Sequence, residues 1–137
     1  MSPARPYRAP TGFDRLVNRL YAAFGRGATL AVRGRKTGKT YTMPVWPLEH
    51  EGARYLVAPR GDTHWARNLR ASGEGELRER GRAQRFRAVE LPADEAAPIV
   101  GLYVERNGPR YGGFVAHEFE QMPDPADHPV FRIEPLS

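Results

Sequence analysis

The sequence of 137 residues contains no cysteine and only three serines. The absence of cysteine excludes disulfides, thiolate metal sites and a cysteine nucleophile. No serine lies in a G-x-S-x-G motif, which argues against a serine hydrolase. The four histidines show neither H-x-x-x-H nor H-E-x-x-H spacing, so we expect no metal site. If the protein is an enzyme, a bound cofactor is therefore expected to carry the reaction.

The sequence also lacks any apolar run near the ~20 residues that a membrane span requires. Its first residues do not contain the apolar segment of a secretory signal. We expect a cytoplasmic protein and leave peripheral contact with a membrane open. Hydrophobic residues make up 40% and charged residues 27%, which is typical of a globular domain. Residues 1–12 hold three prolines and are predicted to form an irregular basic arm, followed by a single domain over residues 13–137.

Acidic residues are almost missing from the first 40 positions. This section holds nine Lys and Arg against Asp14 alone, whereas the remainder carries more acidic than basic residues. A basic section of this kind is a common mark of nucleic-acid binding, but neither a known nucleic-acid module nor interleaved aromatics accompany it. We therefore expect a small polyanionic ligand and no nucleic acid.

The basic section is densest at residues 34–40, G-R-K-T-G-K-T, between two runs that suit β-strands. Glycine lets backbone N–H groups come close to a ligand, arginine offers a fork of donors, and lysine offers a point charge. The segment is not a phosphate-binding P-loop, because Gly34 is one residue too close to Gly38-Lys39-Thr40 and no helix pattern follows. It is predicted to be an anion-binding hairpin loop, with a basic turn that binds nothing as the alternative.

The hydrophobic pattern predicts a small, mainly β protein of the α+β class. Helices are predicted over residues 13–24, 63–71 and about 92–105, and strands over 28–33, 41–49, 53–59, 75–80, 83–91 and 129–134. Pro44 and Pro47 within one strand require a sheet edge or a bulge. These elements favour a six-stranded antiparallel barrel with two to four flanking helices. Residues 106–128 are predicted to be a long connection.

Three motifs resemble the deazaflavin-dependent nitroreductase family, whose cofactor is coenzyme F-420. They are G-R-K-T-G at 34–38 with a proline six residues on, P-R-G-D-T-H-W-A-R-N-L-R-A at 59–71, and D-H-P-V-F-R-I at 127–133. The resemblance covers about residues 13–135. It implies the flavin-reductase-like split β-barrel fold. It also implies a cofactor, an 8-hydroxy-5-deazaflavin with a phosphodiester and an oligoglutamate tail, that is the kind of polyanion the basic section suits.

The resemblance assigns the cofactor's phosphate and tail to the basic loop, and its ring to a wall of apolar residues. The cofactor-binding residues that it implies are Arg35, Lys36, Thr37, Pro44, Val45, Trp46, Arg60, Trp65, Asn68 and Leu69. Other roles stay open for several of these. Trp65 and Leu69 are of types found more often in a hydrophobic core than against a ligand, Trp46 suits either role, and Arg60 also suits a solvated surface.

By the same resemblance, the protein is expected to be an F-420-dependent oxidoreductase that transfers hydride to a quinone, an enone or a nitroaromatic compound. Residues 106–122 are predicted to form one side of the acceptor pocket, and Tyr111 or Tyr103 to donate a proton or orient the acceptor. The alternatives are a non-catalytic binder of F-420 or of a hydrophobic ligand, and an FMN-dependent reductase of the same fold. Whether the protein is a monomer or a homodimer stays open.

Overall fold

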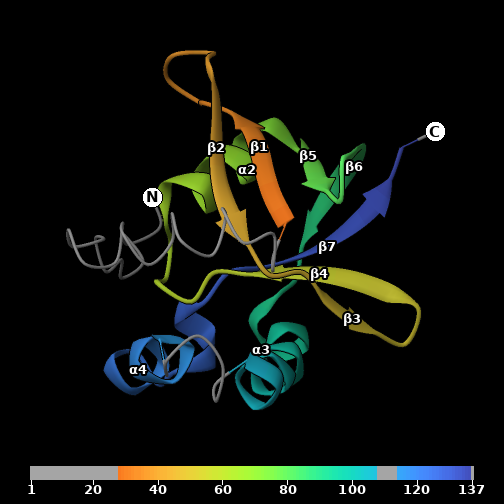
Figure 1. Ribbon diagram of the computed structural model, residues 1–137. Helices are drawn as coiled ribbons and strands as arrows, with labels where there is room; N and C mark the ends of the chain where they lie inside the picture. Colours follow the sequence, from red (N-terminus) through yellow and green to blue (C-terminus); the bar gives the residue numbers. More distant parts are fainter. Residues whose placement is uncertain (1–27, 108–113, 137) are drawn as a thin grey trace.

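The computed structural model describes residues 28–107 and 114–136, and in them one antiparallel sheet is formed in the order β2-β1-β5-β6-β7-β4-β3 (Figure 1). The strands are β1 (Ala28–Arg33), β2 (Thr40–Val45), β3 (Leu48–His50), β4 (Ala53–Val57), β5 (Glu74–Glu79), β6 (Arg82–Glu90) and β7 (Val130–Pro135). The sheet curls into a half-barrel with β2 and β3 at its two edges. The predicted mainly β fold is confirmed.

The described sheet has seven strands, so the prediction of six is wrong. The strand predicted over residues 41–49 ends at Val45 and resumes at Leu48, which makes it two strands, β2 and β3. Pro47 lies in the break, where its missing N–H removes a ladder hydrogen bond. Pro44 lies inside β2 opposite Thr29, at an edge of the sheet, as the prolines predicted. One segment therefore supplies both edges of the half-barrel.

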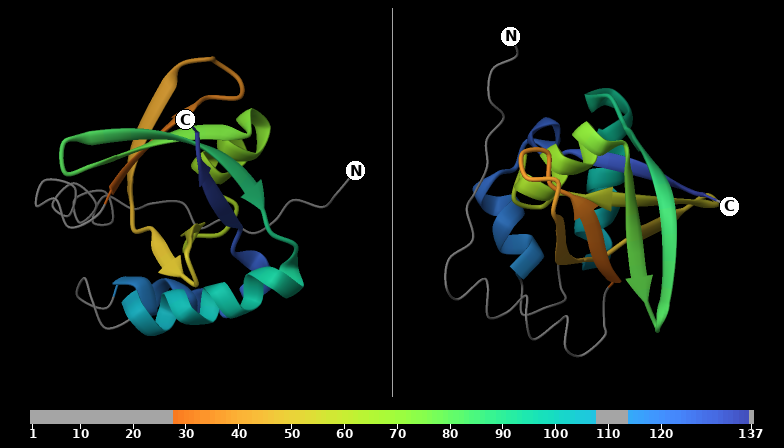
Figure 2. Two further views of the ribbon diagram at one scale, coloured as in Figure 1. Left: turned by 90° about the vertical axis from the view of Figure 1, so that its right-hand side faces the viewer. Right: turned by 90° about the horizontal axis from the view of Figure 1, so that it is seen from above.

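Alternating side chains of the sheet fill two separate hydrophobic cores. Leu56 on β4 and Phe131 on β7 are register partners and belong to the core that contains helix α2 (His64–Ser72). Their neighbours Val57 and Val130 point the other way, into the core that contains helix α3 (Ala93–Asn107). Figure 2 shows α3 as a layer apart from α2. Burial of these apolar side chains is the main stabilising term in such a fold.

Helix α2 confirms the helix predicted over residues 63–71, and its ends are set by local signals. Thr63 is the N-cap, and its hydroxyl accepts a hydrogen bond from the Ala66 N–H at 3.3 Å. Gly73 ends the helix with φ +74°, and its N–H donates to the Leu69 carbonyl. The buried residues Ala66 and Leu69 hold one face of α2 against β1, β5 and β6.

Two arginines of α2 bind carboxylates outside the helix. Arg70 donates to both carboxylate oxygens of Glu90 on β6, at 2.6 and 2.8 Å, and to Asp62 at 2.9 Å. These hydrogen bonds, first of all those to Glu90, raise the pKa of Arg70, although burial acts in the opposite direction. Arg67 lies 3.4 Å from the same Asp62. The helix is thus tied both to the sheet and to the loop that precedes it.

The C-terminal third contains more helix than predicted. Helix α3 confirms the segment predicted over about 92–105, but residues 106–128 also hold helix α4 (Phe114–Gln121) and a 3₁₀ turn, η2 (Pro125–Asp127). The long connection predicted there therefore contains two helical elements that the sequence did not indicate. Phe119 from α4 packs on Tyr103, with ring centroids 6.0 Å apart, and this contact joins α4 to α3. The arm at 1–12 and the helix predicted over 13–24 lie outside the described residues. No helix in the described ranges is long and apolar enough to cross a membrane.

Candidate cofactor-binding site

The basic loop between β1 and β2 closes on itself as a tight hairpin. The Gly34 N–H donates to the Lys39 carbonyl at 2.7 Å, and the Gly38 N–H donates to the Gly34 carbonyl at 3.0 Å. Gly38 has φ +73°, a conformation that favours glycine. The hydroxyl of Thr37 accepts from the Lys39 N–H at 3.2 Å. This short turn leaves the side chains of Arg35 and Lys36 exposed.

Asn68 anchors the loop to α2. Its side-chain oxygen accepts from the Arg35 N–H at 3.1 Å and from Arg35 Nη1 at 2.7 Å. Asn68 is 5% exposed, whereas Arg35 is exposed, so both hydrogen bonds are partly buried. The backbone and the guanidinium of Arg35 are therefore each held by one hydrogen bond to the same oxygen of Asn68. A pre-positioned cation of this kind loses little conformational entropy when it binds an anion.

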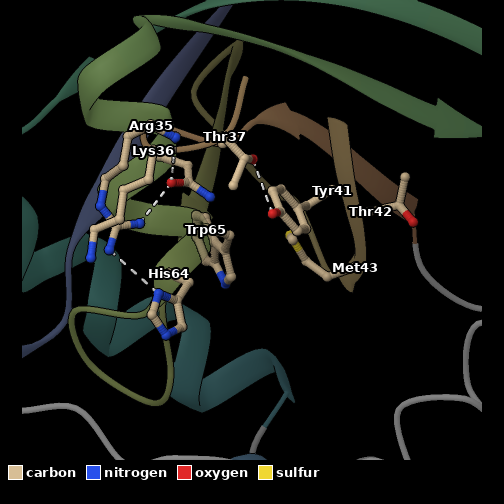
Figure 3. A pocket seen from close by; sticks show the side chains of 10 residues that line it. Arg35, Lys36, Thr37, Tyr41, Thr42, Met43, His64 and Trp65 are labelled. Carbon is tan, nitrogen blue, oxygen red and sulfur yellow. Dashed lines mark hydrogen bonds between the residues drawn. The ribbon is translucent and has the colours of Figure 1, made fainter. Parts of the chain in front are cut away.

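A pocket of about 410 Å³ opens between the loop, β2 and the start of α2. We call it the α2 pocket. It is lined by Gly34, Arg35, Lys36, Thr37, Tyr41, Thr42, Met43, His64, Trp65 and Asn68. Figure 3 shows the basic side chains on one side of Trp65, and Tyr41 and Met43 on the other. The pocket thus joins a cationic side to an apolar side, and its volume lies within the usual range of small-molecule sites.

The hydroxyl groups of Tyr41 and Thr37 form a hydrogen bond on the apolar side of the α2 pocket. Their hydroxyl oxygens are 3.0 Å apart, and Tyr41 is 42% exposed (Figure 3). The ring of Tyr41 lies over Gly34. A β-carbon added at Gly34 would come within 2.5 Å of this ring and 2.9 Å of the Thr37 hydroxyl. Glycine at this position is therefore required for the hydroxyl pair.

Replacing Gly34 by alanine is expected to push the Tyr41 ring aside. The loss of an aromatic contact worth about 0.5–1.5 kcal/mol should then weaken ligand binding in the α2 pocket by about threefold to tenfold. A ligand titration beside a thermal melt would measure this. Gly101→Ala on α3 is the control, because an added β-carbon there meets nothing within 4 Å. Equal affinity of the two variants would show that the position of Tyr41 has no effect on binding.

His64 is a pocket residue that sequence reasoning missed. It is the first residue of α2, is exposed, and its Nδ1 lies 3.4 Å from Nη2 of Arg35. Partial burial, followed by the charges of Arg35, Arg67 and Lys36, lowers the pKa of His64 below its ordinary value of 6.5. The neutral imidazole is therefore the favoured form at neutral pH.

Five of the predicted cofactor-binding residues meet in the α2 pocket, namely Arg35, Lys36, Thr37, Trp65 and Asn68. Leu69 is fully buried in the core beneath α2, and Val45 belongs to the same core. Pro44 lies beside the pocket residue Met43 in β2 and is partly buried.

Trp46, Arg60 and Tyr103 are not among the residues that line the α2 pocket. Trp46 and Tyr103 belong to the core formed with α3, where Tyr103 is 1% exposed. Arg60 is 7% exposed and lies 3.8 Å from the fully buried Glu118 of α4, so it is not a solvated surface charge. A catalytic role of Tyr103 has no support from this placement.

Tyr111 lies outside the described residues. The parts of 106–122 that are described contribute no residue to the lining of the α2 pocket. Within the described ranges, no group of three or more His, Asp or Glu side chains could hold a metal ion.

The pocket residues that were not assigned to cofactor binding from the sequence are Gly34, Tyr41, Thr42, Met43 and His64. A signal for three of them was present. His64 precedes Asn68 by four positions, so the two share one face of α2, and Tyr41 and Met43 alternate along β2 and so share one face of that strand. The sequence of the basic loop did not indicate which face of α2 or of β2 the loop would lie against.

The model of the F-420H(2)-dependent quinone reductase family matches residues 8–121. No curated protein matches the sequence. A solved structure described as an F-420-H2-dependent reductase has 24% identity and a TM-score of 0.57, over 78% of this chain and 92% of that one. A chain described as a domain-swapped dimer has 20% identity and a TM-score of 0.58, over 90% and 100% of the two chains.

HutZ from Vibrio cholerae, described as a heme storage protein, has 13% identity and a TM-score of 0.56, over 87% of each chain. At these identities the solved structures show the shared split-barrel fold and nothing more. The fold carries different cofactors in different proteins, so the cofactor follows from the family match. The match spans most of the chain, including the loop and α2, and this protein belongs to the F-420H(2)-dependent quinone reductase family, as an oxidoreductase that depends on coenzyme F-420.

Proposed function

We propose that the protein transfers a hydride from reduced coenzyme F-420 to a quinone or another electron-poor acceptor, with the cofactor bound in the α2 pocket. The observation that supports this most is that one pocket combines a fixed cationic side with an aromatic side. Coenzyme F-420 has the same two-part chemistry, since an anionic tail is joined to a flat ring. The family membership supports the choice of cofactor.

The cationic side suits the phosphate and the start of the acidic tail. Arg35 offers a planar fork of donors, and Asn68 already holds that fork in place. Lys36 adds a point charge from the same loop. Charge-assisted hydrogen bonds of this kind contribute about 1.5–3 kcal/mol each.

The apolar side suits the deazaflavin ring. Trp65 and Tyr41 offer aromatic faces, and Met43 offers a polarisable sulfur in the same pocket. Pro44 follows Met43 in β2, and no described strand pairs with the outer side of β2. Backbone groups along that edge are accessible to the polar rim of a ring that lies against it.

The reduced deazaflavin supplies the hydride when it is bound. The chain contributes positioning, since an anchored tail and a ring held against Trp65 fix the direction from which an acceptor approaches. The hydroxyls of Thr37 and Tyr41, 3.0 Å apart, can orient a carbonyl oxygen of the acceptor and hold a proton near it. A quinone offers such a carbonyl.

The protein is expected to bind F-420 with micromolar affinity or better and FMN more weakly. FMN carries one phosphate and no acidic tail, so it uses fewer of the cations beside the pocket. Fluorescence titration with each cofactor measures the two affinities. Equal affinities, or no binding of F-420, would contradict the proposed site.

Catalysis is tested separately from binding. Reduced F-420 is mixed with a soluble quinone in the absence of oxygen, and its oxidation is followed by absorbance. A rate proportional to the protein concentration supports the reductase. A rate equal to that without protein, together with tight binding of F-420, would instead support a non-catalytic binder.

A further inference from the structure

His64 and Asn68 both contact the guanidinium of Arg35. Nη1 of Arg35 donates to Asn68 at 2.7 Å, and Nη2 lies 3.4 Å from Nδ1 of His64 (Figure 3). A guanidinium can only donate, so Nδ1 must accept, and the proton of the neutral ring is then on Nε2. An anionic ligand can therefore replace the imidazole as the acceptor for Nη2 while Nη1 keeps its bond to Asn68.

Among the residues that the structure describes, charged groups near His64 come from the β1–β2 loop, from α2 and from the loop before α2. Arg35 and Lys36 approach from the β1–β2 loop, and Arg67 lies on α2 itself. Asp62, from the loop before α2, lies near Arg67 and Arg70, and it offsets part of their charge. The cations therefore dominate at the imidazole, and they disfavour a further positive charge there.

We propose that His64 takes up a proton when an anionic group of the cofactor binds between it, Arg35 and Lys36, and that it thereby becomes a third cation of the binding site. The proposal rests on the proposed function, because it needs the anionic part of F-420 to lie in the α2 pocket. The anion neutralises the two neighbouring cations and accepts a hydrogen bond from the imidazolium. A positive His64, unfavourable in the free protein, then stabilises the complex.

The sign of the pH dependence follows from the two pKa values of His64. In the free protein this pKa lies below 6.5, and the bound anion raises it. At a pH between the pKa of His64 in the free protein and its pKa in the complex, the binding of F-420 is accompanied by the uptake of as much as one proton. The affinity for F-420 therefore increases as the pH falls through this range. Affinity is lowest and constant above the pKa of the complex, and each unit of difference between the two pKa values gives about tenfold in affinity.

The test is isothermal titration calorimetry with F-420 at about pH 6.5 in two buffers of different ionisation enthalpy, which yields the number of protons taken up. His64→Gln removes the titrating ring but keeps an acceptor for Arg35. His50→Gln is the matched control, because His50 lies on β3 next to Glu51 and not in the α2 pocket. Groups on the cofactor that titrate contribute equally to all three proteins.

We expect proton uptake in the wild type and in His50→Gln to exceed that in His64→Gln by a measurable fraction of one proton. We also expect the affinity of His64→Gln to match the wild type at alkaline pH and to fall about fivefold to tenfold below it at acid pH. Equal proton uptake by all three proteins, with F-420 still bound, would overturn this proposal alone. A wild type that binds no F-420 at any pH would overturn the proposed function as well.

Discussion

Replacing Lys36 by alanine is expected to weaken the binding of coenzyme F-420 by about 10–100-fold, because the variant loses one charge-assisted contact worth about 1.5–3 kcal/mol. Lys36 lines the α2 pocket, and its side chain is exposed, so the fold does not depend on it. Arg35→Ala is expected to lose at least as much, because Arg35 also joins the loop to Asn68. Fluorescence titration measures the affinities, and a thermal melt checks that each variant is folded.

Lys39→Ala is the matched control for Lys36→Ala. Lys39 is a lysine of the same loop with an exposed side chain, but it does not line the α2 pocket. Its removal changes the net charge equally and is expected to change the affinity by less than about threefold. If the two lysine variants lose affinity equally, the loop attracts the cofactor only through its overall charge and Lys36 makes no direct contact.

The basic loop could be predicted from the sequence because its functional residues are consecutive. Glycines at 34 and 38 and cations between them define the turn and its chemistry without knowledge of the rest of the fold. Residues from α2 could be predicted only in part. Trp65 and Asn68 were predicted from the family motif. His64 shares a helix face with Asn68, but its contact with Arg35 is visible only in the structure.

The wall of the pocket along β2 could not be placed from the sequence, because it depends on where one strand ends. The break at Trp46 and Pro47 turns the chain from β2 to β3, at opposite edges of the sheet. Trp46 therefore packs in the core with α3, while Met43 and Tyr41 remain at the pocket. Two prolines indicated an edge or a bulge, but not that one segment supplies both edges.

The charged residue Arg60 also required the fold to be placed. In the sequence it stands just before α2, next to glycine and aspartate, where a solvated or ligand-binding charge is expected. In the structure it is buried beside Glu118 from α4, a residue 58 positions further along. Burial of both charges is possible only when they lie close together, and no local pattern reports a partner so distant in sequence.

Asn68→Asp is expected to separate the structural role of Asn68 from the charge of Arg35. The carboxylate keeps an acceptor at 2.7 Å from Nη1 and 3.1 Å from the backbone nitrogen of Arg35. The bond to Nη1 becomes an ion pair, and the bond to the backbone N–H becomes charge-assisted. The stability of the fold is therefore expected to stay the same or to rise slightly. Arg35 is then neutralised by its own protein, so F-420 should bind about 10–100-fold more weakly.

Asn107→Asp is the matched control, since Asn107 is also a buried asparagine, but its Nδ2 donates to the Tyr103 carbonyl in the core with α3. In Asn107→Asp the carboxylate replaces the amide donor and lies next to the Tyr103 carbonyl, which is itself an acceptor. This variant should therefore lose stability but keep its affinity for F-420. Denaturant unfolding gives the free energy of unfolding of each variant, and cofactor titration gives the affinity of each variant for F-420. The opposite pattern, in which Asn68→Asp loses stability and keeps its affinity, would mean that Arg35 serves the hairpin and not the ligand. In that case the anion would have to be held by Lys36 and by His64, and Lys36→Ala would become the more damaging of the two loop substitutions.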